Sequence, residues 1–241
     1  MHVHLPKPLH GWRAFAGEVG IIVLGVLIAL GAEQIVQGAH QRGEARDAER
    51  AIRSELETNM ARLRSRHAVR SCVERRLDEL QGLIDSAGRN GGSIATPKWV
   101  GRPQFWTMQL SRWQATSQAG RAALISPDDL NLYGSMYSFM ERVNSEGALE
   151  QDAWAKLRAI EHLEHLTPDT AFQLQTTLQQ ARYINWRMEV WFVQLQAIFD
   201  RLHLGVVRND VPASRSACVP MSTPRDEAIR QSNSFVQGEP G

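Results

Sequence analysis

The sequence predicts an all-α protein, in which an N-terminal transmembrane helix continues into an antiparallel helical bundle of three long helices and one short helix. Three observations support this class. An uncharged apolar run, Val19 to Ala32, stands near the start of the chain. Two Ser/Thr-Pro-Asp sequences further on precede long stretches with helical spacing of apolar residues. No convincing strand pattern occurs anywhere.

The apolar run is the first element in the chain, and Glu18 and Glu33 bound it. A helix that crosses a bilayer needs ~20 residues. Counted from Phe15 to Val36 the stretch is long enough, and each glutamate then lies about one turn inside an end, where it reaches the headgroups. We therefore expect a single membrane anchor over residues 15–36.

Two other readings of the run stay open. A cleaved signal peptide would need a small-x-small cleavage site, and Gly31-Ala32-Glu33 is a poor one. A buried helix of a soluble domain would keep a polar face, whereas this run is apolar on every face. Both alternatives fit the residues less well than the anchor.

Composition limits the kinds of partner. The chain has 27 Lys and Arg against 26 Asp and Glu, without a long basic block. Nucleic-acid binding therefore has no electrostatic basis here. The 43% hydrophobic and 22% charged fractions favour a folded chain over a disordered one.

Charge gives conflicting indications of topology. Counting Lys and Arg alone places the C-terminal side of the anchor in the cytoplasm. Net charge favours the opposite orientation, because Lys7 and Arg13 precede the anchor with no acid until Glu18, whereas arginines and acids alternate after it. We favour an inner N-terminus. The expected location is the bacterial inner membrane, with the soluble domain in the periplasm.

The two cysteines bear on this orientation. Cys72 falls in the first soluble helix and Cys218 in the C-terminal tail. A cysteine pair in an oxidising compartment is a candidate disulfide, and two unpaired buried thiols are the alternative. A bond would hold a tail that otherwise has little reason to dock.

Helix signals divide the rest of the chain. Ser126-Pro127-Asp128-Asp129 and Thr167-Pro168-Asp169 each combine a capping hydroxyl, a proline in the first turn and acids at the positive end of the dipole. We expect helices over 33–84, 104–119, 127–163 and 168–204, with a loop over 93–103 and Gly147 as a possible interruption. The domains are then a cytoplasmic tail (1–14), the anchor (15–36), a helical bundle domain (37–205) and a Pro/Ser-rich, partly disordered tail (206–241).

The first of these helices carries an imperfect seven-residue repeat. Its apolar members fall on alternating steps of three and four residues: Ile52, Leu56, Leu63, Val73, Leu77, Leu80 and Ile84. Asn59, Arg66 and Arg70 fall in the same register. Such a pattern is more typical of a helix within a bundle than of a free coiled coil.

Catalytic signatures are absent from the sequence. The cluster Glu161-His162-Leu163-Glu164-His165 lacks the spacing of H-E-x-x-H, and a helix end is an ordinary place for histidine. Arginines flank Cys72, but no histidine partner for it is evident. There is no nucleophile elbow, P-loop or dinucleotide fingerprint. We expect no enzyme activity, no catalytic residue, no metal and no cofactor.

Tryptophan is frequent in the helical region. Five tryptophans fall there: Trp106, Trp113, Trp154, Trp186 and Trp191. They can line a ligand pocket between helices or fill the bundle core. We expect the core.

The anchor carries a candidate helix–helix interface. Gly25 and Ala29 form a small-xxx-small pair, Glu33 shares their face, and Glu18 lies two turns before Gly25. Self-association through this stripe is one interpretation. Snorkelling of both glutamates to the bilayer surface is the other.

The anchor also supports a resemblance. Gly17-Glu18-Val19 followed by Gly25-Val26-Leu27-Ile28-Ala29-Leu30 resembles a broad group of uncharacterised bacterial single-pass membrane proteins, whose anchor reads glycine-glutamate, an apolar run, then G-(V/I)-L-I-A-L. The preceding Pro6-Lys7-Pro8 and Gly11-Trp12-Arg13 fit one branch of that group. The resemblance implies a membrane anchor followed by a helical region, and it implies no activity.

Two hypotheses about function follow from the sequence. The first is a membrane-anchored helical-bundle protein that contacts the lipid bilayer and acts by protein–protein interaction, with a protein partner or with itself. The alternative is an extracytoplasmic ligand-binding sensor module that works through a partner.

Overall fold

The computed structural model describes residues 11–205 and 214–233, and this part of the chain is all-α, as predicted. Its α-helices are α1 (Trp12–Ala68), α2 (Arg70–Arg89), α3 (Ser111–Gln118), α4 (Pro127–Leu157), α5 (Pro168–Arg201) and α6 (Arg225–Asn233). Three 3₁₀ turns, η1 (Arg121–Leu124), η2 (Arg158–His162) and η3 (Ser216–Cys218), connect or extend them. The only extended pairing within the described residues is an isolated bridge between Ser93 and His165.

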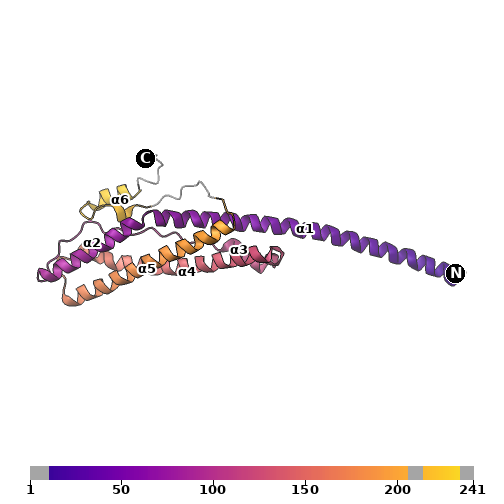
Figure 1. The fold of residues 1–241 in the computed structure, drawn as a ribbon, viewed down its shortest axis with the longest axis horizontal. Coiled ribbons are helices and arrows are strands. Elements are labelled where there is room, and N and C mark those ends of the chain that lie inside the picture. Colours follow the sequence, from indigo (N-terminus) through magenta and orange to yellow (C-terminus); the bar gives the residue numbers. More distant parts are fainter. Residues whose placement is uncertain (1–10, 206–213, 234–241) are drawn as a thin grey trace, which may run out of the picture.

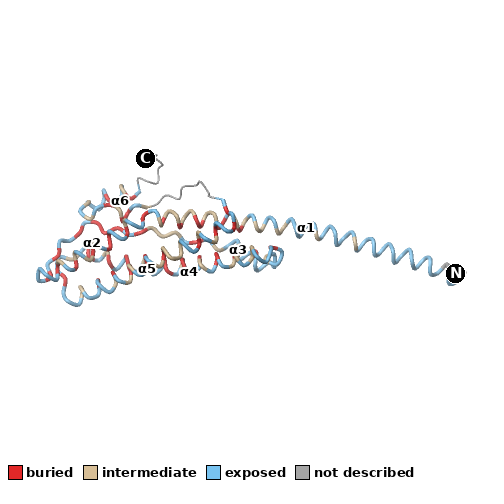
Figure 2. The backbone as a smooth tube through the Cα atoms, in the orientation of Figure 1, coloured by how far each residue is buried: buried red, intermediate tan, exposed pale blue. Residues whose placement is uncertain are grey.

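Helix α1 extends from the bundle as a long single helix (Figure 1). Its N-terminal half is exposed all round, whereas its C-terminal half is buried against α4 and α5 (Figure 2). By length and composition, α1 is the one described helix that can cross a membrane. The predicted anchor 15–36 lies in its exposed half. Residues 1–10 of the predicted cytoplasmic tail lie outside the described residues.

The bundle consists of the second half of α1 together with α2, α4 and α5 (Figure 1). Helix α5 runs back toward the anchor. It begins beside the end of α2, where the Leu166 N–H donates to the Gly92 carbonyl (2.7 Å). It ends beside α1, where Arg53 donates to the carbonyls of Leu202 (3.2 Å) and His203 (3.0 Å).

A break at Val69 divides what the sequence predicts as one helix over 33–84. Val69 has φ −103° and ψ 9°, and it separates α1 from α2. One hydrophobic core, around Leu56 and Met140, lies on the anchor side of the break, and a second, around Leu77 and Trp154, lies beyond it. No proline or glycine marks Val69, so the sequence gives no signal for this break.

The expected helix over 104–119 is shorter in the structure, because α3 begins only at Ser111. Side chains of the long helices satisfy the backbone of the preceding residues. Asn59 binds both the N–H and the carbonyl of Gln109 (2.9 and 2.7 Å), and Asn144 binds both backbone groups of Met108 (2.7 and 3.0 Å). A segment whose backbone groups have such partners does not need helical hydrogen bonds.

Both predicted helix starts are found. The Ser126 hydroxyl accepts from the Asp129 N–H (3.2 Å), and the Thr167 hydroxyl accepts from the Thr170 N–H (3.1 Å). Helix α4 ends at Leu157 rather than at 163 and continues as η2. Gly147 does not interrupt α4. A Cβ atom there would overlap the Phe105 ring, so the glycine makes room for that aromatic side chain.

The C-terminal segment has more structure than the predicted tail, since η3 packs against α2 and α6 packs against η3. The buried Arg76 guanidinium donates to the carbonyls of Val100 and Val219, tying α2 to two loops. Burial lowers the pKa of this guanidinium, and its ion pair with Glu79 opposes that shift. Residues 206–213 and 234–241 of the predicted tail lie outside the described residues.

Candidate interaction surface on α5

Large apolar side chains lie exposed on α5, away from both cores. We call Tyr183, Trp186, Val190 and Val193 the α5 stripe. Tyr183 is 55% exposed, Trp186 59% and Val193 64%, while Val190 is partly buried. Residues spaced by three and four positions share one helical face. The stripe is therefore a continuous apolar band on the outside of the bundle, where polar residues are the norm for a helix.

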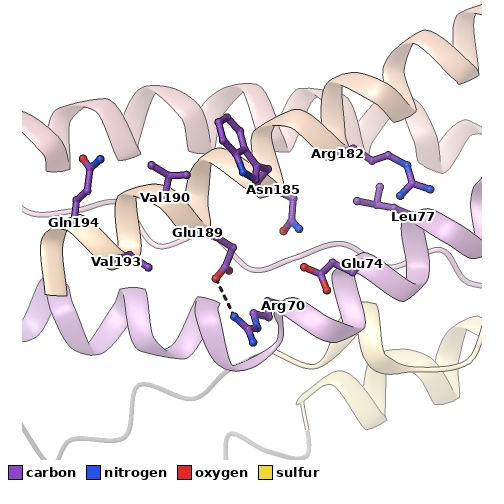
Figure 3. Close-up of a pocket in the computed structure, with 10 residues that line it drawn as sticks. Arg70, Glu74, Leu77, Arg182, Asn185, Glu189, Val190, Val193 and Gln194 are labelled. Atoms are coloured by element: carbon purple, nitrogen blue, oxygen red, sulfur yellow. Dashed lines mark ion pairs between the residues drawn. The ribbon is translucent and has the colours of Figure 1, made fainter. Parts of the chain in front are cut away.

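A groove of about 600 Å³ runs beside the stripe, between α5 and α2. Trp186 lines it from α5. Figure 3 labels two further lining residues of α5, Val190 and Val193, and Leu77 of α2. Leu77 is 1% exposed and belongs to the second core, so this residue forms the floor of the groove. An apolar floor beside a protruding apolar ridge is a surface suited to another hydrophobic side chain.

Charged groups at the rim of the groove are mostly paired within the chain. Glu189 on α5 contacts His67 (2.7 Å) and Arg70 (3.6 Å), the second pair being drawn in Figure 3. Arg182 on α5 pairs with Asp78 on α2 at 2.8 Å. These contacts hold α2 and α5 together along the groove, and they neutralise much of the rim.

Arg187, on the other side of the stripe, is also held. Its guanidinium pairs with Glu146 on α4 at 2.7 Å and lies over the rings of Tyr183 (5.6 Å) and Trp191 (5.4 Å). The rings of Tyr183 and Trp186 are themselves 5.8 Å apart. The central residues of the stripe are thus supported from both sides, and they form a preorganised surface.

The structure brings together the predicted cysteine pair. Cys72 lies in the first turn of α2 and Cys218 ends η3, and their sulfur atoms are joined with the Cα atoms 4.8 Å apart. The link fixes η3 against α2. It belongs to the scaffold of the C-terminal segment, and neither cysteine lines the groove.

The four predicted anchor residues Glu18, Gly25, Ala29 and Glu33 lie on the exposed half of α1. Nothing in the described chain approaches within 4 Å of a Cβ atom built on Gly25. The Glu33 carboxylate accepts a hydrogen bond from Gln37 one turn later (3.0 Å). A single copy of the chain therefore leaves these four anchor residues exposed. Packing of another helix on them stays a prediction.

The Glu161–His165 cluster has contacts of its own. The Glu161 carboxylate accepts from the Val100 N–H (2.8 Å) and pairs with Arg158 (3.2 Å), which ties the loop over 93–103 to η2. The His165 ring packs against Gly92, where a Cβ atom would come within 2.4 Å of it. Within the described residues, no three His, Cys, Asp or Glu side chains are grouped as metal ligands.

The five tryptophans of the helical region lie in two environments, the hydrophobic cores and the surface beside the groove. Trp154 is fully buried in the second core, and Trp106, Trp113 and Trp191 pack against the first. Trp186 differs, because it lies on the surface. Phe172, an apolar residue in the first turns of α5, is also 69% exposed.

Sequence reasoning missed the α5 stripe, although a signal for it exists. The positions Phe172, Thr176, Gln179, Tyr183, Trp186, Val190, Val193 and Ala197 alternate in steps of four and three residues. This seven-residue repeat lies beside the set of residues that faces the core, which includes Leu178, Ile184 and Leu195. Two apolar faces on one helix indicate two packing partners.

Comparison with known proteins gave no match: no family model, no curated protein and no solved structure resembles this chain significantly. Function must therefore be argued from the residues themselves.

Proposed function

We propose that this protein is a single-pass membrane protein of the bacterial inner membrane that binds a protein partner, either a different protein or a second copy of this chain, through the α5 stripe, without catalysis. The observation that carries the proposal is the exposure of Tyr183, Trp186 and Val193 on a helix whose other face is packed in both hydrophobic cores. Aromatic residues beside a pocket are characteristic of the residues that dominate binding energy in protein interfaces. Scattered single apolar residues would not need this explanation, but a continuous band does.

The position of the bundle supports this role. Because α1 runs without interruption from the apolar segment into the bundle, the domain is held at a fixed distance from the bilayer. After the anchor ends at residue 36, the first buried core residue is Ile52, so roughly four turns of helix separate the core from the membrane. A rigid stalk of this kind keeps the α5 stripe accessible to other proteins in or near the same membrane.

We place the bundle in the periplasm. The proximity of Cys72 and Cys218 supports this choice, because disulfides persist in oxidising compartments. A reporter fused after Gly241 tests it. We expect a fused reporter enzyme that works only in the periplasm to be active. A fused reporter enzyme that works only in the cytoplasm should be inactive. The reverse pattern would overturn the orientation.

The binding role is tested by co-purification. The tagged full-length chain is extracted in detergent, and stoichiometric partners are identified by mass spectrometry. We expect Trp186→Glu to lose the partner, because a carboxylate in a desolvated contact is unfavourable. Leu149→Glu is the matched control, since Leu149 is an exposed apolar residue of α4 (49% exposed) outside the groove. Equal partner recovery from both variants would contradict the proposal.

A second candidate function, a ligand-binding sensor module, is favoured by the groove itself. Its volume of about 600 Å³ falls in the range of small-molecule sites. Its apolar floor and the charged groups Arg70 and Glu74 at its edge would suit an amphipathic molecule. If Trp186→Glu leaves every protein association intact but abolishes binding of the amphipathic dye 1-anilinonaphthalene-8-sulfonate, measured by the emission of the dye itself, the sensor function is supported instead.

A further inference from the structure

We propose that the occupant of the α5 stripe is the α5 stripe of a second copy of this chain, packed parallel and in register. This inference rests on the proposed binding role of the stripe and goes beyond it by naming the partner. The pair is a two-fold dimer in which each Trp186 faces the Trp186 of the other copy.

The seven-residue repeat identifies the partner as a helix. The repeat spans 172–197, more than three heptads, with Tyr183 and Val190 at one core position and Trp186 and Val193 at the other. A strict seven-residue spacing stays on one face only where two helices wrap around each other. A small ligand would fill the groove beside the stripe, but it would not cover a band of this length.

The membrane sets the direction of the partner helix. Every copy is anchored through α1 with the same orientation in the same bilayer, and α5 runs back toward the anchor in each. Two α5 helices that meet side by side are therefore parallel. A two-fold axis along the membrane normal then brings each residue of the stripe opposite its own equivalent.

The composition of the repeat suits such self-pairing. Its apolar part, Tyr183 to Val193, would meet the same apolar part of the other copy. Thr176 and Gln179, at the preceding positions, would meet Thr176 and Gln179, where the amide groups can hydrogen-bond across the interface. A copy shifted by one heptad would instead place Thr176 and Gln179 opposite Tyr183 and Trp186, so the repeat favours the in-register pair.

The charges flanking the stripe favour a copy over a strongly charged partner. In a parallel pair Arg182 would approach Arg187 of the other copy, which would be unfavourable for free guanidinium groups. Both are already paired inside the chain, with Asp78 and Glu146. The surface around the stripe therefore carries a balanced set of charges that neither repels its own copy nor selects a partner of one sign.

A charge exchange at Trp186 tests the inference. Two differently tagged full-length copies are co-expressed, and recovery of one with the other is measured after detergent extraction. We expect Trp186→Glu in both copies, or Trp186→Lys in both, to reduce recovery at least roughly tenfold, because like charges would face each other. We expect one Glu copy with one Lys copy to recover together. Rescue by opposite charges at this single position requires that residue 186 of one copy contacts residue 186 of the other copy.

Two controls make each outcome decisive. Leu149→Glu checks the general effect of a surface carboxylate, and Gly25→Ile removes any contribution of the small-residue anchor face. We expect Leu149→Glu to leave recovery unchanged, and we expect the Trp186 exchange to behave in the same way when both copies carry Gly25→Ile. Undiminished pairing of two Trp186→Glu copies, or failure of the mixed pair to recover, would overturn the inference.

If Trp186→Glu instead releases a different protein, the proposed function stands and the self-pairing is wrong. If it releases nothing, both fail.

Discussion

Arg66 of α1 and Glu150 of α4 form an ion pair inside the bundle, with 2.6 Å between Nη2 and Oε1 and with side-chain exposures of 7% and 0%. The same guanidinium nitrogen donates to the Asn185 side chain of α5 at 2.8 Å. This contact joins three helices in one polar layer. The layer lies between the two hydrophobic cores, close to the break at Val69.

Removing one member of this pair should destabilise the bundle strongly. We expect Arg66→Met to lower the free energy of unfolding by roughly 3–5 kcal/mol, because Glu150 would stay buried without its counter-charge. The double variant Arg66→Met, Glu150→Leu should be less destabilised than the single one. Denaturant unfolding of the detergent-solubilised chain, followed by circular dichroism, measures both. A double variant as unstable as the single one would show that the charges are not coupled.

Gly147 should be sensitive to the smallest possible substitution. A Cβ atom at this position would lie 2.1 Å from the Phe105 ring. We expect Gly147→Ala to cost roughly 1–3 kcal/mol in unfolding free energy, as overpacking does. Gly82→Ala is the matched control, since nothing in the described chain lies within 4 Å of its Cβ and alanine favours helix by up to ~1 kcal/mol. Equal effects of the two substitutions would contradict the packing assigned to Phe105.

Two buried tyrosines should make the fold sensitive to alkali. Burial raises the pKa of Tyr133 to about 12. Burial and the hydrogen bond that Tyr137 donates to Glu55 (2.8 Å) raise the pKa of Tyr137 as well. In the unfolded chain, tyrosine loses its proton near pH 10. Between about pH 10 and pH 12 the unfolded state therefore binds fewer protons than the folded state, and stability falls as pH rises.

We expect Tyr133→Phe to flatten this alkaline decline, even if the lost hydrogen bonds lower stability at neutral pH. The measurement is the unfolding free energy at several pH values between about 8 and 11. Tyr183→Phe serves as the control for loss of a tyrosine hydroxyl from an exposed position. A Tyr133→Phe slope equal to that of the original chain would contradict the burial argument.

The cysteine pair gives a prediction about redox state. Cys72 and Cys218 are 146 residues apart in sequence, and a bond between them closes a long loop. Chain-entropy models assign on the order of 4–5 kcal/mol to such a closure. We expect protein extracted and denatured without reductant to resist thiol labelling, and Cys72→Ser to expose Cys218 to it. Labelling of both cysteines in the original chain would show that the bond does not form in the cell.

The parts of the fold that follow from local chemistry could be predicted from the sequence. The starts of α4 and α5 come directly from a hydroxyl cap, a proline and acids, which act within one turn. The apolar run of α1 is similarly local. The break at Val69 could not be predicted, because its neighbour Arg66 binds Glu150, 84 residues away. The extended backbone at Met108 and Gln109 likewise depends on Asn144 and Asn59.

The candidate site was harder to predict than the fold. Its polar rim depends on which helices become neighbours, as with Arg182 and Asp78, or Glu189 and His67. Its apolar residues resemble core residues in type, so Trp186 could be distinguished from Trp154 only by its register on α5. A second seven-residue repeat on the same helix, beside the set of residues that faces the core, is a signal for an exposed apolar face.

Photo-crosslinking in intact cells tests most directly whether the α5 stripe binds protein. A photoreactive amino acid replaces Val193, which is 64% exposed on the stripe, or Leu149, which is 49% exposed on α4. We expect a discrete protein adduct at position 193 after irradiation and none at position 149. The absence of an adduct at 193, or adducts of equal yield at both positions, would contradict the assignment of the α5 stripe as a binding surface.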